Sequence, residues 1–119
     1  MTSSQPLSIV VRIPDVALSR SDLDAALGLE VDRYESSPGR AYAQIDIGDQ
    51  WDAALACVQS VRAVILRLVA EGSIGAPSLD IAMVFPHSYL SKTLTIPADL
   101  AAIAGGAGMD VQLSVYKTE

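Results

Sequence analysis

The sequence predicts one α+β domain, spanning residues 1–119, in which helices cover one face of a sheet and the other face stays open. Its 119 residues suit one domain, and half of them are hydrophobic. Several short segments alternate apolar and polar residues, whereas one long segment repeats apolar residues at helical spacing. Strands buried on both faces are continuously apolar, so the alternation favours a mostly antiparallel sheet.

Four alternating segments are predicted strands, and each ends near a glycine, a proline or a polar residue. They are residues 8–13, 41–47, 79–85 and 109–116. Residues 93–95 are a candidate short fifth strand, and the polar segment 31–40 is predicted to be a loop. We expect Met109, Val111, Leu113 and Val115 to face the helices, because they form the apolar side of the last strand.

Three helices are predicted from capping residues and helical periodicity. Ser19 can cap a helix over residues 20–27, and Gly28 suits its left-handed end. Asp49 can cap a long helix over residues 50–71, and Pro97 suits the first position of a helix over 97–104. The long helix has an apolar stripe wide enough to need a sheet beneath it. That stripe consists of Trp51, Leu55, Val58, Val61, Ile65, Leu68 and Val69.

Together these elements predict a four- to five-stranded, mostly antiparallel sheet with one long and two short helices on one face. The nearest named arrangement is a variant of the ferredoxin-like fold. Strand order is not readable from one sequence, so the neighbours of each strand stay open.

Charge and composition exclude several classes of partner. The chain has 14 acidic and 8 basic residues, a net charge of −6, and no cluster of Lys and Arg. Binding to nucleic acid or to an anionic membrane needs such clusters, so we expect neither. Polar residues interrupt the apolar segment 53–70, and residues 1–14 lack the features of a signal peptide. A cytoplasmic location is therefore expected.

The usual catalytic and metal-binding motifs are absent from the sequence. One histidine, His87, and one cysteine, Cys57, do not form the ligand sets of zinc sites, so no metal or other cofactor is expected. Cys57 lies within the apolar long helix, where a buried, unreactive thiol is expected. The glycine-rich segment 105–108 follows a helix rather than opening one, which favours a turn over a phosphate loop. These absences favour a non-enzyme, and the sequence leaves the question open.

The open face of the sheet is the predicted functional surface. Its residues are Val10, Arg12, Tyr42, Gln44, Asp46, Asp80, Ala82, Val84, Asp110, Gln112, Ser114 and Tyr116. Arginine and tyrosine are typical of protein interfaces, although an ordinary solvated face and acid–base chemistry by paired carboxylates are open alternatives. The candidate binding residues are Arg12, Tyr42, Gln44, Asp110, Gln112 and Tyr116.

Several segments together resemble a bacterial family described as domain of unknown function 4279. They are the strand 8–13, LSRSDLDAALGL at 18–29, Trp51 at the long helix, LTIPADL at 94–100 and MDVQLSVY at 109–116. The resemblance spans nearly the whole chain. The family has no assigned chemistry, so the resemblance implies no catalytic residue. Some of its members are similar to toxin-immunity proteins, which implies binding rather than catalysis.

We therefore expect a non-catalytic protein-binding module, either immunity-like or homodimeric through the open sheet face. Its partner would be another protein or a second copy of the chain. The alternative is a small-molecule-binding protein or minor enzyme with a cleft near His87, Tyr89 and Tyr42. A purely structural subunit is a third possibility.

Overall fold

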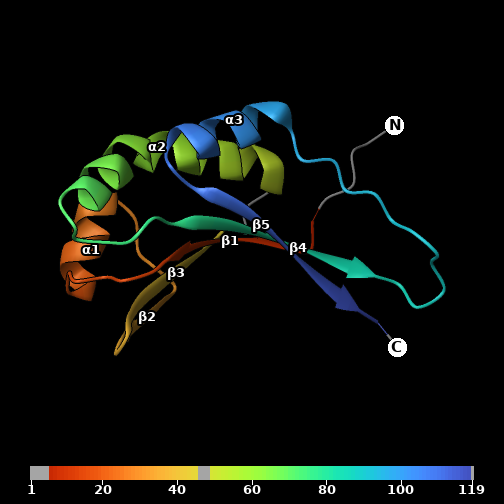
Figure 1. Ribbon diagram of the computed structural model, residues 1–119, viewed down its shortest axis with the longest axis horizontal. Helices are drawn as coiled ribbons and strands as arrows, with labels where there is room; N and C mark the ends of the chain where they lie inside the picture. The colour runs from red at the N-terminus through yellow and green to blue at the C-terminus, as the bar shows by residue number, and fades with distance from the viewer. Residues whose placement is uncertain (1–5, 46–48, 119) are drawn as a thin grey trace.

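The structure of the protein is a computed structural model that describes residues 6–45 and 49–118. Within these residues the chain forms five strands and three helices, and the helices all lie on one face of the sheet (Figure 1). In chain order the elements are β1 (Ser8–Ile13), α1 (Arg20–Leu27), β2 (Arg33–Ser36), β3 (Gly39–Ile45), α2 (Gln50–Ala70), β4 (Ser78–Phe85), α3 (Ala98–Gly106) and β5 (Asp110–Lys117).

The strands lie in the order β2-β3-β1-β4-β5. The first four pair antiparallel in the ferredoxin-like order, with β1 between β3 and β4. β5 adds to the β4 edge in parallel, and α3 provides the crossover that a parallel pair needs. The structure thus confirms the predicted α+β class and the mostly antiparallel sheet with one long and two short helices on one face.

Helix α2 packs its apolar stripe on the sheet and forms the centre of the core. Trp51 is buried at its start, and the stripe continues through Val58, Ile65 and Leu68. The Asp49 carboxylate caps the helix by accepting from the backbone N–H of Trp51 at 3.0 Å and of Asp52 at 3.3 Å. The predicted cap and stripe are both confirmed, and the helix ends at Ala70.

By length and composition, α2 is also apolar enough to cross a membrane, with a mean hydropathy of 1.7 over its most apolar part. The core helix of a soluble protein passes the same test, so the property is weak support for a membrane span. Here one side of the helix is buried against β1, β3 and the other two helices.

Helix α1 has the predicted bounds and both predicted end residues. The Ser19 hydroxyl accepts from the Asp22 backbone N–H at 3.2 Å, and Gly28 adopts a left-handed conformation with φ 72°. Leu23 and Leu27 are the buried residues of this helix. The cap and the left-handed glycine define both ends locally, so the sequence alone could locate this helix.

The predicted loop over residues 31–40 is wrong, because Arg33–Ser36 forms β2 and β3 begins at Gly39. The two strands form a hairpin whose turn contains a cis Ser37–Pro38 peptide bond. β2 lies at the sheet edge, where polar side chains stay in water, so the strand has little apolar character. Its half-buried Tyr34 is fixed by a hydroxyl that donates to the Leu18 carbonyl at 2.6 Å.

Two other strand predictions need adjustment. Residues 93–95 form no strand, and they belong to an extended connection between β4 and α3. The predicted strand 41–47 begins two residues earlier, at Gly39, and is described as far as Ile45. Asp46 and Ile47 lie outside the described residues.

The predicted burial of β5 is correct only at the residue that precedes the strand. Met109 is buried, but Val111, Leu113 and Val115 are 37%, 52% and 54% exposed. β5 is an edge strand, and its second half extends beyond the helical layer (Figure 1). The alternation of the sequence correctly gives the side of each residue, but the reach of the helices decides whether that side is covered.

We predict opposite stability changes for two glycine-to-alanine substitutions. A Cβ at Gly39 would overlap the Val16 carbonyl, so Gly39→Ala should lower the free energy of unfolding by roughly 1–3 kcal/mol. A Cβ at Gly105 in α3 meets nothing within 4 Å, so Gly105→Ala should raise it by about 0.5–1 kcal/mol. Urea unfolding followed by circular dichroism measures both. Equal midpoints for the two variants would contradict the close approach at Gly39.

Candidate functional site

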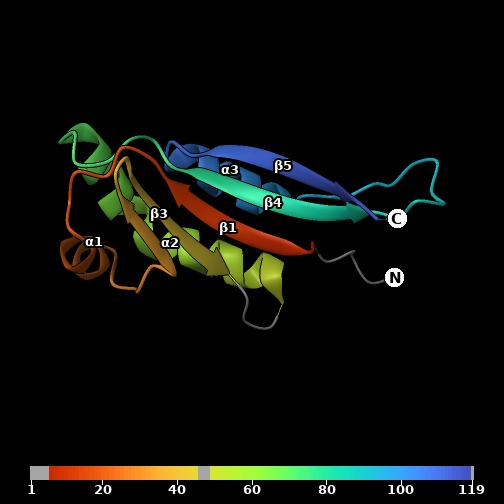
Figure 2. The same ribbon diagram turned by 90° about the horizontal axis from the view of Figure 1, so that it is seen from below.

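The open face of the sheet carries the candidate site. The helices leave this face uncovered, as Figure 2 shows from the side opposite to them. On β1, for example, Ile9, Val11 and Ile13 are buried under the helices, whereas Val10 and Arg12 point to the open side. The alternation in the sequence therefore decides which residues can form the site.

A buried carboxylate lies at the centre of this face. Asp80 on β4 is 5% exposed and is the one buried charged residue among those that the structure describes. Arg12 on β1 donates to one Asp80 oxygen through Nε at 3.0 Å and through Nη2 at 2.8 Å. The Ser114 hydroxyl on β5 donates to the other oxygen at 2.7 Å. Both oxygens of Asp80 thus have partners, as a buried charge requires.

The same arginine extends the contacts to the other half of the sheet. The Arg12 guanidinium carbon lies 5.4 Å from the centre of the Tyr42 ring on β3, and that of Arg33 on β2 lies 5.7 Å from it. Such distances allow cation–π attraction. The Tyr42 hydroxyl donates to Glu35 at 3.3 Å, and Glu35 pairs with Arg33 at 3.5 Å.

These polar contacts cross all five strands in the order in which the strands lie in the sheet. We call this set the cross-sheet network. It consists of Arg33, Glu35, Tyr42, Arg12, Asp80 and Ser114. Because a long side chain reaches its diagonal neighbour on the next strand, the network depends on strand register as well as on face.

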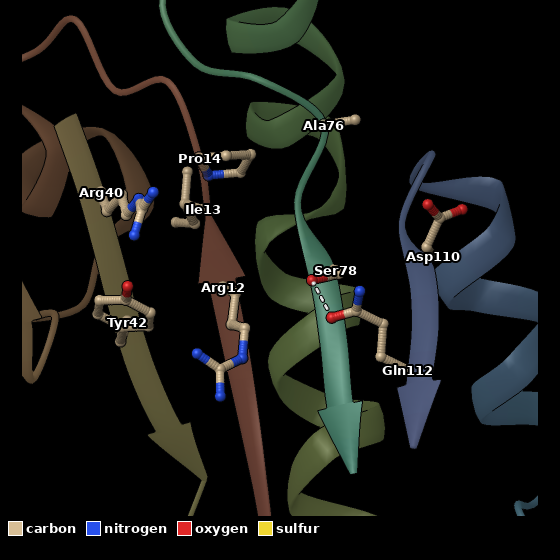
Figure 3. A pocket seen from close by; sticks show the side chains of 9 residues that line it. All are labelled: Arg12, Ile13, Pro14, Arg40, Tyr42, Ala76, Ser78, Asp110 and Gln112. Atoms are coloured by element: carbon tan, nitrogen blue, oxygen red, sulfur yellow. Dashed lines mark hydrogen bonds between the residues drawn. The ribbon is translucent and has the colours of Figure 1, made fainter. Parts of the chain in front are cut away.

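Two adjoining hollows flank Arg12, and both are also lined by Arg40 and Tyr42. The first has a volume of about 440 Å³ and extends to β5, where Asp110 and Gln112 line it (Figure 3). The second has a volume of about 520 Å³ and extends over β2 and β3. Both are open to solvent along the sheet.

The first hollow has a free cation on one side and a free anion on the other. Arg40 is exposed on β3, and Figure 3 shows its guanidinium pointing toward β1. Among the described residues, neither the Arg40 side chain nor that of Asp110 makes a hydrogen bond or ion pair. Arg12 differs, because its charge is paired with Asp80. Between the free charges, Ser78 hydrogen bonds to Gln112 at 3.2 Å.

The structure brings five of the six candidate binding residues to these hollows. Arg12, Tyr42, Asp110 and Gln112 line the first hollow, and Gln44 lines the second. Tyr116 does not line either hollow, because it lies near the end of β5 opposite Val84.

Sequence reasoning missed four contributors to the site. Arg33, Glu35 and Arg40 lie in the predicted loop, so the sequence gives them no face. Ser78 precedes the predicted third strand and was not given a face either. An alternation that continues backward from residues 41–47 would have placed Arg40 beside Tyr42, but Gly39 and Pro38 suggested an earlier break.

The predicted cleft near His87 does not form around the three residues named for it. Tyr42 is opposite Arg12, which in turn is opposite Ser78 at the start of β4. His87 is exposed beyond the end of β4, where its backbone N–H donates to the Thr118 hydroxyl at 3.3 Å. Tyr42 and His87 therefore lie toward opposite ends of the sheet. Neither hollow is lined by His87 or Tyr89.

The remaining reactive groups provide no second site within the described residues. No group of three His, Cys, Asp or Glu side chains there is placed to hold a metal ion. Cys57 is partly buried against the core, and this burial raises the pKa of its thiol. The glycine-rich segment ends α3 and turns into β5, with Gly108 at φ 73°, so the predicted turn is confirmed.

Comparison with models of known protein families, with curated proteins and with solved structures finds no match to this chain. The resemblance to the domain 4279 family therefore stays a prediction. Function has to be inferred from the open face itself.

We predict that Asp80→Ala destabilises the protein by about 2 kcal/mol, because it leaves the Arg12 and Ser114 groups without their acceptor. The Arg12 side chain is 42% exposed and can regain water, so the loss should fall below the ~3–5 kcal/mol of a fully buried pair. Asp110→Ala removes an exposed carboxylate and should change stability little. Equal urea midpoints for the two variants would contradict the central role of Asp80.

We predict that Cys57 reacts slowly with a water-soluble disulfide reagent in the folded protein. Its raised pKa leaves less thiolate in the folded protein than a free cysteine has near its ordinary pKa of about 8.5. The pH at which the reaction rate of Cys57 reaches half its maximum should be higher for the folded protein than for the protein unfolded in urea. Because folding opposes this ionisation, the free energy of unfolding should fall as pH rises through that range. Equal rates in folded and unfolded protein would contradict the burial.

Proposed function

We propose that the chain is a non-catalytic protein-binding module that recognises its partner through the open sheet face. The observation that carries this proposal is the pair of open hollows around Arg12 and Tyr42. At the two sides of the first hollow, Arg40 and Asp110 have no side-chain partner among the residues that the structure describes. Arginine and tyrosine are the residue types that most often dominate the binding energy of protein interfaces.

The form of the hollows favours a protein over a small molecule. Small-molecule sites are usually concave, largely apolar and able to enclose most of the ligand. These hollows are open, share three lining residues and carry charged groups along the sheet. A surface of this kind suits a partner that covers several strands at once.

The separated charges define the chemistry of the partner. A carboxylate on the partner would meet Arg40, and a lysine or arginine would meet Asp110. Such complementary charges give specificity and orient the partner. The net charge of −6 would also speed the approach of a basic protein and would oppose a second copy of this chain on the same charged face. An immunity-like role, in which the face covers another protein, is therefore preferred to self-association through this face.

Acid–base catalysis is less well supported than binding. Both oxygens of Asp80 are engaged with Arg12 and Ser114, which leaves that carboxylate poorly placed to transfer protons. Asp110 is exposed near the start of β5. The small-molecule alternative near His87 loses its basis, because Tyr42 does not join His87 and Tyr89.

We predict that Arg40→Glu abolishes capture of the partner while Arg62→Glu does not. Both substitutions reverse one exposed charge, but Arg62 belongs to α2 on the helical side of the molecule. The immobilised chain and both variants are exposed to a lysate of the source organism, and bound proteins are identified by mass spectrometry. A protein retained by wild type and Arg62→Glu and lost from Arg40→Glu is then purified.

Calorimetry with that purified protein should show at least a roughly tenfold weaker Kd for Arg40→Glu, equivalent to about 1.4 kcal/mol. Equal affinities of wild type and Arg40→Glu would overturn the proposal that the open face binds the partner. A metabolite screen by thermal shift tests the alternative: a compound that raises the Tm of wild type, but not of Arg40→Glu, would make the hollow a small-molecule site.

A further inference from the structure

The two edges of the sheet differ in how they are protected from pairing. An edge strand exposes unpaired backbone groups, and proteins usually protect it by shortness, charge or proline. The β2 edge has four residues and carries Arg33 and Glu35. The β5 edge has eight residues, no proline and charges only at its ends, Asp110 and Lys117. The β5 edge therefore lacks the protection that the β2 edge has.

The unprotected edge also carries exposed apolar side chains. Val111, Leu113 and Val115 form a row on the helix side of β5 and are 37%, 52% and 54% exposed. The row continues from Met109, which is buried in the core. Figure 2 shows β5 as the outermost strand, and no described strand pairs with its free edge. An added strand on this edge would extend the apolar layer from the core.

We propose that β5 pairs antiparallel with β5 of a second copy of the chain and joins the two sheets into one. A two-fold axis at Leu113 would pair Leu113 with itself and Val111 with Val115 on the helix side. On the open side it would pair Gln112 with Ser114 and Asp110 with Tyr116. Each pair within residues 110–116 joins apolar to apolar or polar to polar, and no like charges are opposite each other. Lys117 falls opposite Met109 at the end of the interface.

The charges along β5 favour a second copy of the chain as the partner of this edge, and they favour antiparallel over parallel pairing. β5 carries one anion at its start, Asp110, and one cation near its end, Lys117. Antiparallel pairing brings the start of one strand beside the end of the other, so each end of the interface holds one anion and one cation. Asp110 is on the open side of the sheet and Lys117 on the helix side. Parallel pairing would bring like charges together. The central six residues, 111–116, are uncharged, so no charged side chain has to be buried in the middle of the contact.

The proposed dimer also explains the one candidate binding residue that the hollows do not include. Tyr116 is far from the first hollow within one chain, but the register about Leu113 would place Tyr116 of one copy beside Asp110 of the other. Each first hollow would then gain an aromatic wall from the second copy. This consequence rests on the proposed function, whereas the pairing of the edges does not.

The oligomeric state in solution tests the pairing. Sedimentation equilibrium of the wild-type chain should give a mass twice 12.5 kDa. An eight-residue edge is about 26 Å long, which is small for an interface, so the measurement should span protein concentrations of roughly 1–200 µM. Leu113→Lys would place two cations at the axis and should weaken dimerisation at least tenfold. Leu66→Lys, at a residue 43% exposed on α2, is the matched control and should stay dimeric.

A cysteine substitution tests the register. In a Cys57→Ser background, Leu113→Cys should form a disulfide-linked dimer on mild oxidation, because the axis places residue 113 opposite itself. Val115→Cys alone should not, because its counterpart is residue 111. Circular dichroism and Tm show whether each variant folds.

A wild-type chain that is monomeric at the highest concentration would overturn the inference. So would a dimer that Leu113→Lys leaves unchanged. If Arg40→Glu loses partner capture but still dimerises, the open-face function is supported separately from the dimer. If the monomeric Leu113→Lys still captures the partner, the open face and the β5 edge act independently.

Discussion

The Arg12–Asp80 pair is the interaction on which the open face depends. A carboxylate that is 5% exposed on the uncovered side of a sheet needs partners from neighbouring strands, and Arg12 and Ser114 supply them. Arg12 then reaches Tyr42 on its other side, so one guanidinium connects both halves of the sheet. The same pairing offsets much of the charge of Arg12, whereas the Arg40 side chain makes no hydrogen bond or ion pair within the described part of the chain. Under the proposed function, stability depends on Arg12 and recognition on Arg40, two arginines of one surface.

The fold could be predicted wherever its causes are local. The caps at Ser19 and Asp49, the left-handed Gly28 and the alternation of β1, β4 and β5 are all determined by nearby residues. β2 could not be predicted, because a short polar edge strand is stabilised by its neighbour and by the contact between Tyr34 and Leu18 rather than by its own pattern. The exposure of β5 could not be predicted either, because it depends on how far the helices extend.

The sequence could predict which side of the sheet each site residue occupies, but it could not predict which of these residues lie next to one another. Alternation correctly placed Arg12, Tyr42 and Gln112 on the open side, but only strand order shows which of these residues meet. That order brings β3, β1, β4 and the start of β5 around one hollow and leaves Tyr116 at the distant end of β5. The two proposed surfaces follow from the same topology. The face carries the charges through which we propose that a partner is selected, and the edge carries the uncovered apolar row.

The central claim is that Asp80 holds Arg12 in place and leaves Arg40 free to meet a partner. Solvent exchange of the arginine Nε–H protons, measured by NMR on the isotope-labelled chain, tests it most directly. The Arg12 Nε–H donates to Asp80 at 3.0 Å, so its exchange should be much slower than that of Arg40 and Arg62. If the Arg12 proton exchanges as fast as that of Arg40, the pair does not hold the face together and the division between the two arginines is wrong.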